Sequence, residues 1–138
     1  MVTNTFDDLA RTIAKEIKNR HRTTGWRDVS DWVPNRTSGR LLVIRNHLEM
    51  IVVLDELTVS VSGSFGTTRF PSGLRPSYRT LSSWYRSDGL EGSGVMNLSG
   101  GGYFNIYNTV AGQAMSARLV ADFLPTAGWP NPLPGDPA

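Results

Sequence analysis

Residues Arg40 to Gly63 read RLLVIRNHLEMIVVLDELTVSVSG, and the pattern of this stretch decides the fold class. It predicts two strands joined at Arg45-Asn46, one over residues 41–44 and one over residues 47–54. Because side chains alternate between the two faces of a strand, the second strand has one continuous apolar face. That face consists of Leu48, Met50, Val52 and Leu54.

The opposite face of this second strand begins polar and becomes apolar at Ile51 and Val53. A strand that is apolar on both faces needs a covering layer on each face, supplied by a second sheet or by another subunit. After a break at Asp55-Glu56 the alternation resumes over residues 57–61. β-Branched residues are frequent there, which favours strand over helix.

The second half of the chain predicts several shorter strands separated by loops and glycine turns. A loop over Phe65 to Pro76 precedes them. The predicted strands cover residues 78–85, 95–99, 103–107 and 114–123. Closely spaced short strands with glycine turns are typical of an antiparallel sandwich or barrel. We therefore expect a mainly β fold, with an antiparallel β-sandwich or barrel over residues 25–124.

The N-terminal segment has the pattern of a helix from Thr5 to Arg20. Thr5 is placed to cap the first turn, and the acidic and basic residues at the two ends complement the helix dipole. The apolar residues form one narrow stripe on an otherwise polar helix. They are Phe6, Leu9, Ile13 and Ile17.

This stripe needs a partner, because a lone helix of about 15 residues is marginally stable in water. Two partners are consistent with the pattern. The helix packs onto its own β domain, or it forms a short parallel coiled coil between subunits, since the stripe approximates a heptad seam. In the second case, residues 1–24 are a helical stem or attachment element.

Two further segments flank the predicted strands. The connector from Arg22 to Gly39 is rich in turn-forming residues, and we expect Trp26 and Trp32 to pack it against the domain. The tail over residues 125–138 carries five prolines and cannot pair inside a sheet. We expect the tail to lie extended over the surface, anchored by Trp129.

The composition excludes several classes of partner and binding site. The formal net charge is +2, and no dense basic face interleaved with aromatic residues is evident, so nucleic-acid binding is not expected. The chain has no cysteine, which excludes disulfides and thiolate metal sites. No signal peptide and no apolar run of roughly 20 residues is present, so membrane insertion is not expected either.

Few titratable residues are placed for catalysis. His47 and Glu49 share one strand face and could hold a metal or act as an acid and base, but a third ligand is not evident. His21 lies among arginines at the end of the helix. We expect no enzyme, no catalytic or metal site and no cofactor; a glycan-active enzyme that uses His47 or Glu49 is the alternative class.

Surface recognition is the function that remains. Exposed aromatic residues with polar neighbours can stack on sugar rings or on protein partners. Candidates lie near strand ends and glycine turns, although for each aromatic residue taken separately the burial statistics favour a place in the core or an interface. They are Trp84, Tyr85, Arg86, Tyr103 and Tyr107.

Three segments over about residues 25–138 together resemble a known family. They are the RNHLEMIVVLD arm, the FPSGLRPSYR loop, and VMNLSGGGYFNIYN followed by AMSARLVADFLPTAGWPNPLPG. Their order is similar to that in the C-terminal β domains of minor tail proteins and tail fibres of phages that infect actinobacteria. The matching positions are Phe70, Pro71, Gly73, Leu74, Arg75, Pro76, Val95, Asn97, Ile106, Trp129 and Pro130.

The resemblance implies a virion protein that forms a homotrimer of antiparallel β-sandwich knobs, residues 25–124, on a coiled stem. The stem would bind other virion proteins of the tail or capsid, and the knob would meet a host-envelope glycan. A capsid decoration or head-fibre protein with the same fold and no dedicated receptor is the alternative.

Overall fold

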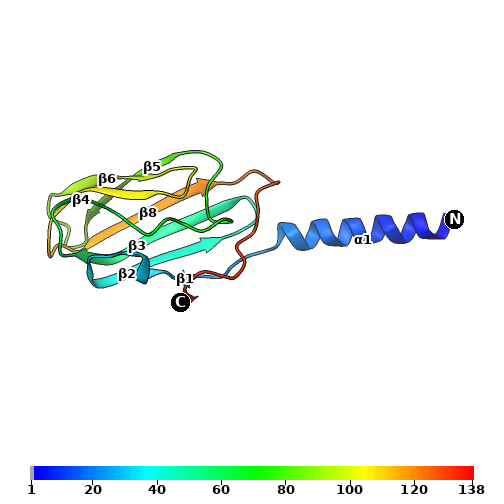
Figure 1. The fold of residues 1–138 in the computed structure, drawn as a ribbon, viewed down its shortest axis with the longest axis horizontal. Helices are drawn as coiled ribbons and strands as arrows, with labels where there is room; N and C mark the ends of the chain where they lie inside the picture. The colour runs from blue at the N-terminus through cyan, green and yellow to red at the C-terminus, as the bar shows by residue number, and fades with distance from the viewer. Residues whose placement is uncertain (1) are drawn as a thin grey trace.

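The computed structural model describes residues 2–138. A helix, α1 (Val2–Arg20), extends from one end of a β domain, as Figure 1 shows. The helix begins before Thr5, so Thr5 lies inside it, and the predicted cap at this residue is wrong. Val2, Thr3 and Asn4 include neither glycine nor proline, so none of them stops the helix at Thr5.

The β domain contains nine strands and one 3₁₀ turn, η1 (Ser30–Trp32), among the described residues. The strands are β1 (Arg27–Asp28), β2 (Arg36–Arg45), β3 (Glu49–Val59), β4 (Gly63–Gly66), β5 (Thr80–Arg86), β6 (Ser93–Leu98), β7 (Phe104–Thr109), β8 (Met115–Asp122) and β9 (Asp136–Pro137). They form one sheet in the order β4-β7-β6-β5-β8-β3-β2-β1-β9. Every neighbouring pair is antiparallel. The fold is therefore mainly β with one N-terminal helix, as the sequence predicts.

The sheet curls at the junction between β5 and β8. Only three residue pairs join these strands, from Trp84–Ala117 to Arg86–Met115. Beyond the junction, the half formed by β4, β7, β6 and β5 lies over the half formed by β8, β3 and β2 (Figure 1). Apolar side chains from both halves form one buried cluster, to which Leu54, Trp84 and Ile106 belong.

The β2–β3 hairpin confirms the most prominent prediction from the sequence, although β2 begins at Arg36, inside the predicted connector, and not at Leu41. Leu41 pairs with Leu54 and Ile44 pairs with Ile51. Met50, Val52 and Leu54 are buried, as expected for the apolar face of the second strand. Leu48, however, lies before β3 and is exposed, so its place on that face was wrongly predicted.

The predicted break at Asp55-Glu56 is an irregularity within one continuous strand. β3 runs through it to Val59, and its pairing with both neighbours changes register at this point. Glu56 has a positive φ of 52°, and the facing Gly39 has a φ of 77°. A Cβ on Gly39 would overlap the Glu56 carbonyl oxygen, so the close approach of the two backbones requires glycine here.

The C-terminal tail completes one edge of the sheet. β9 pairs with β1, and Arg27 donates hydrogen bonds to the carbonyl oxygens of Pro134 (2.7 Å) and Gly135 (2.9 Å). Trp129 lies against Arg22, whose guanidinium is 4.3 Å from the ring centre. The tail is thus attached at both of its ends, and Trp129 is the anchor that the sequence predicts.

No helix among residues 2–138 is long and apolar enough to cross a membrane.

Candidate interaction surfaces

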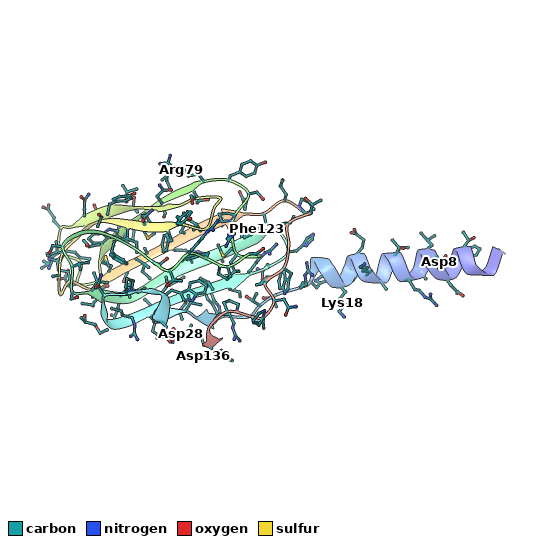
Figure 2. All side chains as sticks on the ribbon, viewed as in Figure 1. Asp8, Lys18, Asp28, Arg79, Phe123 and Asp136 are labelled. Atoms are coloured by element: carbon teal, nitrogen blue, oxygen red, sulfur yellow. The ribbon has the colours of Figure 1, made fainter. Side chains whose placement is uncertain are left out.

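The apolar stripe of α1 is exposed. Phe6, Leu9, Ile13 and Ile17 have between 50% and 71% of their surface accessible to solvent. The helix points away from the β domain, and its side chains, including Asp8 and Lys18, project into solvent in Figure 2. Of the two partners considered for this stripe, the β domain of the same chain does not cover it.

Charge is unevenly distributed along this helix. Asp7 and Asp8 lie toward its start, whereas Lys15 and Lys18 lie in its last two turns. With His21, Arg22 and Thr23, the two lysines line an open hollow of about 630 Å³ at the neck between the helix and the β domain. The lining of the neck is therefore basic.

A buried arginine lies beside this neck. Arg45 is only 1% exposed, and its guanidinium carbon is 4.0 Å from the centre of the Phe123 ring and 5.0 Å from that of Trp129. Its Nη1 donates hydrogen bonds to the carbonyl oxygens of Gly73 and Gly128. Burial, and next the positive charge of Arg22, lower the pKa of Arg45 to about 10. Arg45 is therefore still charged at neutral pH, held by carbonyl groups and aromatic rings.

Trp84 is not a surface residue, which corrects its place among the candidate recognition residues. It is 1% exposed and belongs to the core. Its side chain points inward from β5, and its indole Nε1 donates a hydrogen bond of 2.8 Å to the carbonyl oxygen of Tyr107. Gly94 faces it on β6, where a Cβ would collide with the indole. Trp84 thus packs the sheet where it curls.

The other predicted recognition residues are accessible but do not form one cluster. Tyr85 and Tyr107 are exposed on β5 and β7, which β6 separates. Arg86 forms an ion pair of 2.7 Å with Asp88, and its hydrogen bond is the main reason why the pKa of Asp88 is lowered. Tyr103 lies in the β6–β7 turn, where the guanidinium of Arg69 is 4.9 Å from its ring centre.

A groove beside Arg69 was not predicted from the sequence. It has a volume of about 340 Å³ and is lined by Trp32, the loop 68–72 and the tail 131–135. We call it the Trp32 groove. Its lining includes one aromatic residue, several prolines, Arg69 and Asn131. Aromatic and apolar surfaces with a few polar groups are typical of small-molecule sites.

Each wall of the Trp32 groove is held in place. The backbone NH of Thr68 donates a hydrogen bond of 2.8 Å to the Trp32 carbonyl oxygen, and the Trp32 ring lies 5.0 Å from that of Phe70. Arg69 Nε donates a hydrogen bond of 2.7 Å to the Gly101 carbonyl oxygen. The tail wall is fixed by Arg27, as described above. The only signal in the sequence was a tryptophan and a proline-rich tail, which also suit simple packing.

His47 and Glu49 lie beside the β2–β3 turn, His47 before β3 and Glu49 at its first residue. Within residues 2–138, no three His, Cys, Asp or Glu side chains are grouped so that they could hold a metal ion.

Comparisons with protein-family models and with curated proteins found no match to this chain.

Proposed function

We propose that this protein is a non-enzymatic phage virion protein, in which three copies form a β-sandwich knob on a helical stem. The single observation that carries the proposal is the exposed apolar stripe of α1, on a helix that extends away from its own β domain. The resemblance of residues 25–138 to tail-fibre and minor tail protein domains supports the same assignment.

Helix association explains the stripe energetically. Full burial of a leucine, isoleucine or phenylalanine side chain contributes about 1.5–3 kcal/mol. In a parallel bundle, each copy would bury Phe6, Leu9, Ile13 and Ile17 against its neighbours, which offsets the marginal stability of a lone helix. The stem would also bind other virion proteins of the tail or capsid, with its basic neck toward an acidic surface.

Mutation of the stripe tests the assembly. We expect the full chain to elute at three times its mass of 15.2 kDa in size-exclusion chromatography with light scattering. Ile13→Glu is expected to shift the protein to monomer, because three carboxylates would meet in the apolar seam. Arg11→Glu places the same side chain on the opposite face of the helix and is expected to leave the trimer intact. A monodisperse monomer of the unmodified chain would contradict the proposal.

The knob would meet the host envelope, and the Trp32 groove is the surface that suits a glycan best. Sugar rings stack on aromatic faces and bond to guanidinium and amide groups, and the lining offers both. Tyr103 extends this surface through its contact with Arg69.

Removal of the Arg69 side chain tests the glycan site. Loss of a hydrogen bond to a charged group costs about 1.5–3 kcal/mol, so Arg69→Ala is expected to weaken binding about tenfold or more. The probe is polysaccharide purified from actinobacterial envelopes, measured by calorimetry. Arg79→Ala, which removes an exposed arginine just before β5 and outside the groove, is the matched control and is expected to bind as the unmodified protein does. An intact trimer that does not bind this polysaccharide would instead favour a decoration protein without a receptor.

A further inference from the structure

We propose that the outward face of β2, β3 and β8 is the surface through which the β domains of different copies contact one another. This inference rests on the assembly proposed above and specifies which face of the β domain that assembly buries.

The pairing of the strands places five aliphatic side chains on this face. Leu42 lies opposite Val53, and Ile44 lies opposite Ile51, which in turn lies opposite Val120. These residues alternate with the buried residues of the same strands, so they point away from the core. The four residues of β2 and β3 are partly exposed, and Val120 is 41% exposed.

A groove extends this apolar face toward the sheet edge. Trp26, Leu42 and Val53 line it together with Arg40 and Ala138, and its volume is about 320 Å³. Trp26 is 40% exposed there. A large aromatic side chain beside a row of aliphatic ones is the composition of a protein interface core, where aromatic residues are enriched.

Charged residues lie at the two ends of the aliphatic rows. At one end Arg40 and Asp55, which are partners in the β2–β3 register, form an ion pair of 2.7 Å. At the other end Glu49 lies opposite Asp122. On β8, Arg118 lies opposite Val53, so a charged residue also borders the aliphatic side chains on this side. An apolar centre within a charged rim is the usual anatomy of a protein–protein interface.

The attachment of the stem indicates that another copy of this chain covers the face. The segment after α1 joins β2 directly: Thr23 pairs with Asn46, and Thr24 and Arg45 exchange hydrogen bonds of 2.9 Å. In Figure 1 the axis of α1 lies nearly parallel to the line of the antiparallel strands β2 and β3. Helices bundled around one axis would therefore bring the β domains alongside that axis, with β2 and β3 near it.

The stem also needs this additional contact. Its stripe from Phe6 to Ile17 spans less than two heptads, and short coiled coils are marginal when they stand alone. A stable interface buries roughly 800 Å² on each partner, whereas the stem stripe consists of four apolar side chains. The same chain thus has two uncovered apolar surfaces that run along one direction, and a second copy covers both.

Cross-linking of single-cysteine variants tests the inference, because the natural chain has no cysteine. Ile51→Cys reports on the proposed face and Ile13→Cys on the stem. Val95→Cys, which is exposed on β6 in the other half of the sheet, is the control. With a short bis-maleimide reagent on the full chain at equal concentration, we expect covalent dimers in denaturing gels for Ile51→Cys and Ile13→Cys. We expect none above background for Val95→Cys.

The outcomes separate this inference from the proposed function. Dimers with Ile13→Cys, together with only background with Ile51→Cys and Val120→Cys, would leave the stem assembly standing and overturn the proposed face. Background with all variants and a monomer in light scattering would overturn both. Val120→Cys is the second reporter of the same face, in case Ile51→Cys disturbs folding, which far-ultraviolet circular dichroism checks for each variant.

Discussion

Replacement of Arg45 by alanine is expected to lower the free energy of unfolding by about 3–5 kcal/mol, because several buried interactions disappear at once. The carbonyl oxygens of Gly73 and Gly128 lose their donor. The rings of Phe123 and Trp129 lose the guanidinium that packs against them. The deletion also leaves a cavity where a fully buried side chain lay.

The relief gained by removing the buried charge of Arg45 does not compensate for these losses. Its lowered pKa means that burial disfavours the charged form, so folding bears this electrostatic cost at neutral pH, and the cost is relieved only as the pH rises through about 10. The carbonyl groups and rings offset the cost, and they gain nothing from a methyl group in its place. Removal of the side chain therefore loses more than it relieves.

Chemical denaturation at fixed protein concentration measures the effect. Arg45→Lys keeps the charge but loses the planar guanidinium and its stacking. The free energy of unfolding of this variant is expected to lie between those of Arg45→Ala and the unmodified protein. Arg79→Ala removes an exposed arginine from the surface and is expected to change stability by about 0.5 kcal/mol or less. Equal denaturation midpoints for Arg45→Ala and Arg79→Ala would contradict the expected contribution of Arg45 to stability.

Trp84→Ala is expected to cost about 3–5 kcal/mol, the usual range for a fully buried tryptophan. The substitution empties the core at the junction of β5 with β8, where only three residue pairs connect the two halves of the sheet. It also leaves the Tyr107 carbonyl oxygen without the indole donor. The two halves would then separate more easily.

The neighbouring residue supplies the matched control. Tyr85 points to the other face of the same strand and is exposed, so Tyr85→Ala is expected to change stability by about 0.5 kcal/mol or less. Unfolding followed by circular dichroism compares the two variants. Equal losses for Trp84→Ala and Tyr85→Ala would contradict the inward orientation of Trp84.

The sequence predicts the long hairpin well, because its alternation extends over many residues and matches the period of a strand. It misses β1, β4 and β9, since elements of two to four residues have no measurable periodicity. It also treats Trp84 and Tyr85 alike, because which of two adjacent aromatic residues faces the core depends on how β5 pairs with β6 and β8.

For a related reason, only some of the candidate interaction surfaces could be predicted from the sequence. The α1 stripe is local in sequence, so its four residues could be named in advance. The Trp32 groove combines segments near residues 32, 70 and 133, and Arg45 takes its partners from Gly73 and Gly128. Such sites depend on contacts between segments far apart in the chain, which no local pattern records.

The pairing of β9 with β1 has a consequence for uncontrolled polymerisation. An unpaired edge strand is a template to which strands of further chains can add, so that the sheet grows continuously. Here the outermost strand has only two residues, and Pro137 has no amide hydrogen to offer an incoming strand. The molecule is thereby protected against growth into fibrils from this edge of the sheet.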